Sequence, residues 1–142
     1  MINLGDEIIV QTEKLTSTGD AIARIGEEKL VVFIKGALPD EKVKVKIISK
    51  NKKFLKGEII ELIQASANRI KPFCPIYNAC GSCNFQIANY DFQIEQKNLI
   101  LKELFSPWVD KLKPMVKSPD IACYRHKIQY PARQTKVSKR VL

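Results

Sequence analysis

Residues 6–63 alternate between apolar and polar side chains with the two-residue period of β-strands. Five short runs rich in isoleucine and valine carry this pattern, and they read "DEIIVQTEKL", "AIARI", "KLVVFI", "KVKVKII" and "FLKGEIIELI". Turn-forming stretches such as "STGD" and "SKNKK" separate them, and no helical pattern intervenes. Five strands joined by short turns are typical of a small barrel of the oligonucleotide-binding type. We therefore predict such a barrel over residues 1–66.

The pattern changes to helical spacing in "NYDFQIEQKNLILKELF", which follows a polar, cysteine-containing loop. Asn89 is the expected N-cap, and Pro107 is expected to end the helix at Ser106. The apolar stripe of this helix consists of Tyr90, Ile94, Leu101, Phe105 and the adjacent Leu104. Alternation returns in "YRHKIQYPAR", which predicts another strand. The expected fold class is α+β, mainly β with one helix: after the barrel, residues 67–142 hold the cysteine loop, the helix and the start of a β central domain.

Charge narrows the class of partner. The chain has 24 lysines and arginines against 15 acidic residues, a formal net charge of +9. This excess favours a polyanionic partner, and nucleic acid before an anionic membrane, because no basic amphipathic helix is evident. The longest apolar run, "LVVFI", is far too short to span a membrane, and the first residues do not resemble a signal peptide. We therefore expect a cytoplasmic protein with no membrane partner, while a chain that is merely cationic remains the alternative.

Two groups of basic residues are the candidate RNA contacts. In "KVKVKII" the lysines alternate with valines and so share one strand face, and two more lysines lie in the following turn. Such a lysine face can also serve only to discourage edge pairing between strands. The second group lies in the basic segment near the end of the sequence. The candidate residues are Lys42, Lys44, Lys46, Lys52, Lys53, Arg125, Lys127, Arg133 and Lys136.

Three cysteines gather in the loop "KPFCPIYNACGSCNFQ" with the spacing C-x5-C-x2-C. Cys74, Cys80 and Cys83 could bind structural zinc, but they form only one C-x2-C pair, and His126 lies in a strand pattern. An iron–sulfur cluster held by thiolates accepts such irregular spacing. Three unligated thiols are the remaining alternative. Cys123 is either a fourth ligand or a small buried apolar residue, and the second is the commoner fate of an isolated cysteine.

The whole chain resembles the N-terminal part of the RNA (uracil-5-)-methyltransferases, which make 5-methyluridine in bacterial ribosomal RNA. The segment "GALPDEKVKVKI" resembles the hallmark of the TRAM domain, the RNA-binding barrel that opens these enzymes. The segment "CPIYNACGSCNFQ", followed by a helix and then "YRHKIQYPARQTK", resembles their cluster-binding region and the start of their central domain. The occurrence of the three segments in this order is more specific than any one of them.

The resemblance implies roles for individual residues. Cys74, Cys80 and Cys83 would bind a [4Fe–4S] cluster; the family's fourth cysteine lies further along than Cys123, which is therefore not assigned as a ligand. Ser82 replaces a glycine of the family pattern. With three assured ligands, the chain is expected to hold the cluster poorly.

The resemblance also implies a function. The partner would be structured RNA, chiefly ribosomal RNA, and not DNA. The S-adenosylmethionine pocket and the catalytic residues belong to a C-terminal domain of the family that would follow Leu142, so these 142 residues alone are expected to be inactive. Two alternatives remain: a stand-alone RNA-binding module with a structural metal site, and a ferredoxin-like redox protein, which would need complete ligation of its cluster.

Overall fold

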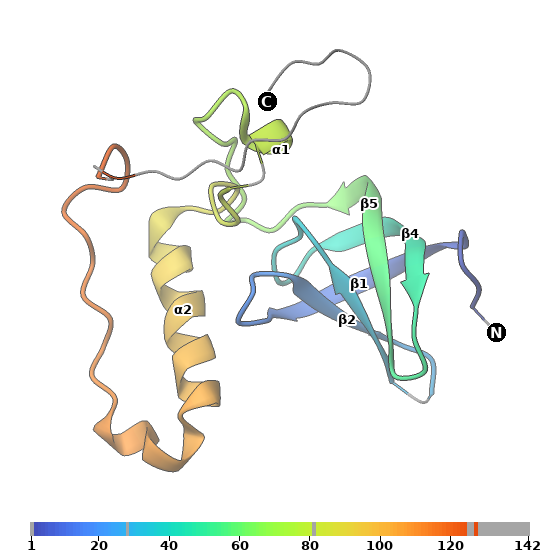
Figure 1. Ribbon diagram of the computed structural model, residues 1–142, viewed down its shortest axis with the longest axis horizontal. Helices are drawn as coiled ribbons and strands as arrows, with labels where there is room; N and C mark the ends of the chain where they lie inside the picture. Colours follow the sequence, from blue (N-terminus) through green and yellow to red (C-terminus); the bar gives the residue numbers. More distant parts are fainter. Residues whose placement is uncertain (1, 28, 81, 125–126, 128–142) are drawn as a thin grey trace.

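A computed structural model describes residues 2–27, 29–80, 82–124 and 127, and its N-terminal part is a closed barrel (Figure 1). The five strands are β1 (Glu7–Leu15), β2 (Ala21–Ile25), β3 (Leu30–Ile34), β4 (Lys42–Lys50) and β5 (Phe54–Gln64). They follow the order β1-β2-β3-β5-β4 around the barrel, and β4 pairs back to β1. β3 and β5 are parallel, and the other neighbours are antiparallel. The predicted five-stranded barrel and the α+β class are confirmed.

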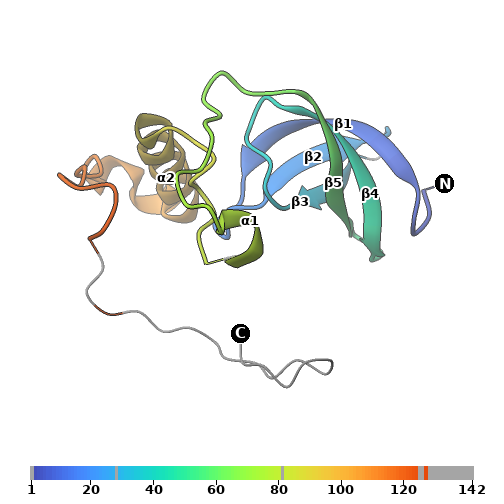
Figure 2. The ribbon, with the colours of Figure 1, turned by 90° about the horizontal axis from the view of Figure 1, so that it is seen from above.

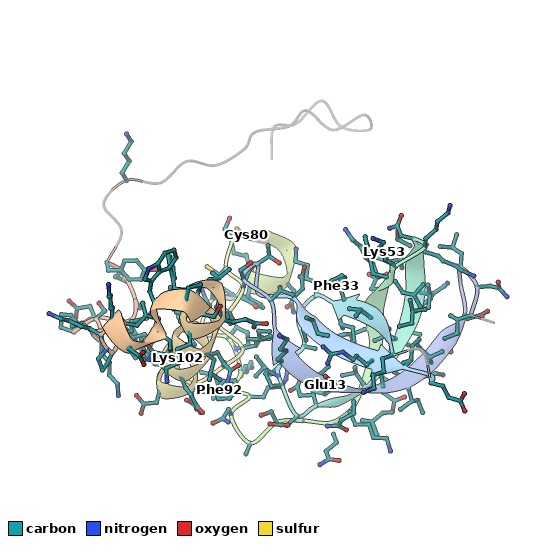
Figure 3. The ribbon with its side chains drawn as sticks, turned by 90° about the horizontal axis from the view of Figure 1, so that it is seen from below. Glu13, Phe33, Lys53, Cys80, Phe92 and Lys102 are labelled. Carbon is teal, nitrogen blue, oxygen red and sulfur yellow. The ribbon has the colours of Figure 1, made fainter. Side chains whose placement is uncertain are left out.

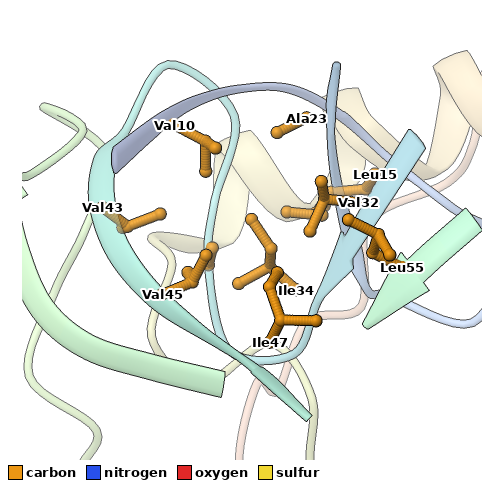
Figure 4. Close-up of a cluster of buried hydrophobic side chains, with 11 residues drawn as sticks. Val10, Leu15, Ala23, Val32, Ile34, Val43, Val45, Ile47 and Leu55 are labelled. Atoms are coloured by element: carbon orange, nitrogen blue, oxygen red, sulfur yellow. The ribbon is translucent and has the colours of Figure 1, made fainter. Parts of the chain in front are cut away.

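The interior of the barrel is filled by the apolar half of each alternating strand (Figure 4). On β4, Val43, Val45 and Ile47 are buried while the lysines between them lie outside. A Cβ atom added at Gly57 on β5 would lie 3.1 Å from the Cβ of Val45, so glycine lets these two strands approach closely. The buried core consists of Val10, Leu15, Ala21, Ala23, Val32, Ile34, Ala37, Val43, Val45, Ile47 and Leu55.

The loop between β3 and β4 is held by a buried carboxylate. Glu41 has no exposed surface, and its Oε2 accepts hydrogen bonds from the backbone N–H of Leu38 at 2.8 Å and from Nη2 of Arg69 at 2.8 Å. Its Oε1 accepts from Nε of Arg69 at 2.5 Å and from the backbone N–H of Ser66 at 3.2 Å. Arg69 also donates to the carbonyl of Gly36 at 2.8 Å. This network fastens the segment that follows β5 to the barrel.

Beyond the barrel lie a short helix α1 (Tyr77–Cys80), a longer helix α2 (Tyr90–Leu104) and the 3-10 turns η1 (Ser106–Lys111). Figure 1 shows α2 next to the barrel, and Lys14 of β1 forms an ion pair with Glu103 of this helix. Figure 2 shows the same arrangement from above. The side chain of Asn89 accepts a hydrogen bond from the N–H of Phe92 at 2.9 Å, which confirms the predicted N-cap. Pro107 does not directly end α2, since the helix stops at Leu104 and Pro107 lies at the start of η1.

The predicted apolar stripe of α2 is only partly correct. Ile94 is buried, but Leu104 and Phe105 are 60% and 44% exposed, and Phe92 is buried in their place. Phe92 packs with Leu38, Ile87 and Ala88, because the N-terminal half of α2 meets the cysteine loop and the β3–β4 loop. In the C-terminal half of the helix, Ile100 packs against the barrel core, whereas Leu99 and Leu104 are exposed.

Several predictions about the second half fall outside the described residues. Of the strand expected in "YRHKIQYPAR", only Tyr124 and Lys127 are described. The start of a β central domain therefore stays a prediction, as does the division of the chain at residue 66. Within the described ranges, none of the helices has the length and apolar character that a membrane span needs.

Candidate nucleic-acid interface and cysteine loop

The lysines of β4 lie on the outside of the barrel, as the alternation predicted, but glutamates surround them. Nζ of Lys44 lies 2.7 Å from Oε2 of Glu7 on β1, and Lys44 is also opposite Glu61 on β5. The hydrogen bond and charge of Lys44 lower the pKa of Glu7, and those of Glu7 raise the pKa of Lys44. Both groups are well exposed, so this pair contributes little to stability.

The same pattern continues along the strand. Lys46 lies opposite Glu7 on one side and Glu58 on the other, while Lys42 is opposite Gln11 and Gln64. Three lysines of β4 therefore share their outer face with three glutamates of the neighbouring strands. The structure brings these predicted RNA contacts together, in a surface of mixed charge.

The turn between β4 and β5 is more strongly basic. Lys52 and Lys53 are exposed, and neither forms an ion pair with any residue that the structure describes. The turn lies beside the β2–β3 turn, because β3 and β5 run parallel with Val31 opposite Phe54. Of the second predicted group of basic residues, Lys127 is exposed. Arg125, Arg133 and Lys136 lie outside the described residues.

An aromatic pair that the sequence analysis missed lies on the outer face of β3 and β5. The ring centroids of Phe33 and Phe54 are 5.4 Å apart, with the ring planes at 71°. Both side chains are half-buried and neither belongs to the barrel core. The alternation of "LVVFI" could have placed Phe33 outside, but its contact with Phe54 depends on the parallel pairing of β3 and β5, which the local pattern does not encode.

The cysteine loop presents its thiols at the surface. Cys80 and Cys83 are exposed, Cys74 is partly buried, and all three are free of disulfides. Sγ of Cys80 lies 3.2 Å from Oγ of Ser82, and hydrogen bonding with the Ser82 side chain and backbone lowers the pKa of the Cys80 thiol. In the part of the chain that the structure describes, no group of three or more His, Cys, Asp or Glu side chains is placed to hold a metal ion.

The fourth cysteine is also accessible. Cys123 is exposed, so its interpretation as a small buried apolar residue is wrong. It lies in an irregular segment that runs along the surface after η1 and is not part of either apolar core cluster.

The cysteine loop is docked against the turn between β1 and β2. Nδ2 of Asn84 donates to the carbonyl of Thr18 at 3.0 Å, and Phe85 packs against the barrel core. Gly19 has a φ of +88°, and a Cβ atom there would lie 3.3 Å from that of Asn84, so glycine serves both the turn and the close contact. Tyr77 Oη donates to the carbonyl of Asn84 at 3.0 Å, which braces α1 within the loop.

One view relates the cysteine loop, the aromatic pair and the basic turn. Figure 3 shows Cys80, Phe33 and Lys53 along its upper side, with Phe33 between the other two, whereas Glu13 and Phe92 lie lower.

Comparison with known proteins gives the following relatives. Residues 3–60 match the TRAM domain. The 23S rRNA (uracil(1939)-C(5))-methyltransferase RlmD of Vibrio parahaemolyticus is 40% identical over 95 residues, which cover 67% of this chain and 21% of that protein. An uncharacterized RNA methyltransferase of Bdellovibrio bacteriovorus is 33% identical over 130 residues, 89% of this chain and 33% of that protein.

A solved structure also matches. It is the solution structure of a conserved protein of Methanococcus maripaludis, 32% identical, which covers 42% of this chain and 83% of its own, with a TM-score of 0.39. The chain thus spans about a fifth of the Vibrio protein and a third of the Bdellovibrio protein, 21% and 33% of their lengths.

Proposed function

Because the chain belongs to the family of RNA (uracil-5-)-methyltransferases, we propose that it is the part of such an enzyme that binds ribosomal RNA. The observation that carries this proposal is the closed barrel, which matches the TRAM domain over residues 3–60. The net charge of +9 supports it, because basic side chains that neutralise phosphates supply most of the sequence-independent affinity for nucleic acid.

The proposed activity of the whole enzyme is methyl transfer from S-adenosylmethionine to C5 of a uridine. The uracil C5 target rests on the name of the Vibrio relative, of which the chain spans 21%, and the methyl donor on the resemblance to the family. In this scheme the barrel holds the RNA, and the described residues carry no step of the methyl transfer.

We assign the phosphate contacts first to Lys52 and Lys53, which are exposed in a turn and lack an acidic partner among the described residues. The β4 lysines, of which Lys44 and Lys46 lie opposite glutamates, are the second candidates, together with the basic residues near the end of the sequence.

Replacing Lys52 and Lys53 together by alanine tests this assignment. Each phosphate contact on a single strand contributes about −0.7 to the slope of log affinity against log salt, so the slope should become shallower by up to about 1.4. Removing Lys111 and Lys113 is the matched control, since it takes the same charge from the exposed end of η1 and the residues after it. No binding by the unaltered chain at low salt, or an unchanged slope in the Lys52/Lys53 variant, contradicts the proposal.

We further propose that Cys74, Cys80 and Cys83 bind a [4Fe–4S] cluster. The donor chemistry fits, because thiolates are the ordinary ligands of such clusters and hydrogen bonding with Ser82 lowers the pKa of the Cys80 thiol. The arrangement does not yet fit, because the described side chains do not surround one centre. The loop would have to close around the cluster, which would supply electron-transfer or structural chemistry, and no catalytic step is derived through it.

Anaerobic reconstitution with iron and sulfide tests the cluster. The chain should acquire the broad absorption of a [4Fe–4S] cluster and bound iron, and replacing Cys80 and Cys83 by serine should abolish both. Cys123→Ser is the matched control, since Cys123 is equally exposed and should leave the iron content unchanged. Full iron retention in the Cys80/Cys83 variant, or its loss on replacing Cys123 alone, would contradict these ligands.

A further inference from the structure

We infer that the outer face of β2, β3 and β5 is a stacking surface for unpaired bases of single-stranded RNA, with Phe33 and Phe54 as its base contacts. The inference rests on the proposed RNA-binding function and goes beyond it by naming the face and the form of RNA. This surface, the aromatic face, consists of Ile22, Arg24, Val31, Phe33, Phe54 and Lys56.

The strand register builds the aromatic face from two rows. Directly opposed residues in a sheet point to the same side, and the buried partners of these strands fill the core. One row runs Ile22, Phe33 and Lys56 across the three strands, and the next runs Arg24, Val31 and Phe54. The two phenylalanines are thus diagonal neighbours on adjacent strands.

The packing of the barrel core does not explain why two aromatic rings lie on its outer face. The barrel core is complete without Phe33 and Phe54, and both remain partly exposed in an edge-to-face pair with centroids 5.4 Å apart. An aromatic ring offers a base a flat π-face, and such stacking accepts any base. In barrels of this type, the face of the second and third strands is the common oligonucleotide site.

The charges beside the rings suit a nucleic acid backbone. Lys56 is exposed and lies opposite Phe33, while Lys52 and Lys53 immediately precede Phe54 in the chain. Among the described residues, none of these three lysines forms an ion pair. This contrasts with β4, where Lys44 is bound to Glu7 at 2.7 Å. The barrel therefore has one face with aromatic rings and unpaired lysines, and another with balanced charges and no aromatic pair.

The form of RNA follows from the geometry. Bases within a duplex are already stacked and cannot cover a ring, so the aromatic face favours unpaired bases with their phosphates on the lysines at its edge. In the view of Figure 3, Phe33 lies between Lys53 and Cys80.

The test measures binding of the full chain to a fluorescent single-stranded RNA of about ten nucleotides, within the usual site size of such barrels. Replacing Phe33 and Phe54 together by leucine keeps apolar bulk on the sheet and removes the π-faces. Affinity should fall by about 5- to 150-fold, the usual loss for one stacked base, with the salt slope unchanged. The corresponding tyrosine variant should retain affinity. Replacing Ile9 and Ile48 by alanine is the control, because both are exposed on the β1–β4 exterior.

A second variant tests the aromatic face without changing the packing of the two rings. Lys56→Ala removes one exposed charge from the aromatic face and should make the slope shallower by about 0.7, whereas Lys102→Ala, which removes an exposed charge from α2, should not change it. A duplex of the same sequence should bind more weakly than the single strand.

The outcomes separate the two levels of the proposal. If the unaltered chain does not bind RNA at low salt, the proposed function itself is wrong. If it binds, but the leucine variant has the affinity of the unaltered chain, the aromatic face is overturned while RNA binding stands. Equal affinity for single strand and duplex also overturns the stacking surface.

Discussion

Glu41 is a carboxylate with no exposed surface in a small barrel, and its two oxygens accept four hydrogen bonds. A buried charge is tolerated when it is paired and its lone pairs are used, and Arg69 supplies two of these bonds from beyond β5. The segment "GALPDE", which could be recognised in the sequence as a hallmark, therefore has a structural reason for ending in glutamate.

Removing Arg69 should be costly because it leaves this charge without its partner. Arg69→Met is expected to lower the free energy of unfolding by about 3 kcal/mol, as measured by urea denaturation. Arg24→Met, which removes an exposed pair with Glu13, is the matched control and should cost at most about 1 kcal/mol. Equal effects of the two substitutions would show that burial of Glu41 is not what makes Arg69 important.

The contribution of the Glu7–Lys44 ion pair to the stability of the fold should depend on pH in a known direction. The lowered pKa of Glu7 means that the pair stabilises the fold at neutral pH and that this contribution is lost as the pH falls through that lowered value. At the alkaline end it is lost as the pH rises through the raised pKa of Lys44.

Glu7→Gln tests this dependence through the thermal midpoint. The variant should melt slightly below the unaltered chain at neutral pH, and the two should converge in acid once Glu7 is protonated. Because both groups are exposed, the difference should also shrink with added salt. A gap that persists unchanged into acid would mean that the ion pair is not its cause.

Among the elements, the strands were the most predictable and their closure the least. Alternation located all five strands, because one side of each must fill the core. The parallel pairing of β3 with β5 depends on contacts distant in sequence, and the Phe33–Phe54 pair could not be foreseen without it. The buried side of α2 was misjudged for a similar reason, because tertiary contacts bury Phe92 and leave Leu104 exposed.

The start of α2 rests on its N-cap. Asn89 accepts from the N–H of Phe92 and donates to Oδ1 of Asn68 at 2.8 Å, so Asn89→Ala should cost about 1 kcal/mol of stability. Asn89→Asp keeps the acceptor and should cost less, despite losing the donor to Asn68. The measurement is urea denaturation followed by circular dichroism, and an aspartate variant as unstable as the alanine variant would assign the effect to Asn68 instead.

In the molecule as a whole, the barrel and the cysteine loop are joined by specific contacts. The predicted boundary at residue 66 separates Glu41 from Arg69, although the two are bonded in the structure. Sequence reasoning identified the three cysteines and the basic turn by local spacing. It could not show that the cysteine loop docks against the β1–β2 turn, where Asn84 donates to the carbonyl of Thr18.

The length of the barrel fragment provides a test at this scale. Residues 1–66 should fold alone as the barrel, but a fragment of residues 1–72 should be more stable by about 3 kcal/mol, because it contains Arg69. The longer fragment with Arg69→Met should match the shorter one. Equal stability of the two unaltered fragments in urea would refute the role given to this contact.

The central claim is that this chain binds RNA through one face of the barrel. The most direct measurement is a backbone and aromatic chemical-shift map of the full chain, titrated at low salt with single-stranded RNA. We predict that the largest changes fall on Phe33, Phe54 and Lys56 and on the turn holding Lys52 and Lys53, while the exterior of β4 changes little. Changes concentrated on Lys42, Lys44 and Lys46, or no changes at all, would contradict the account.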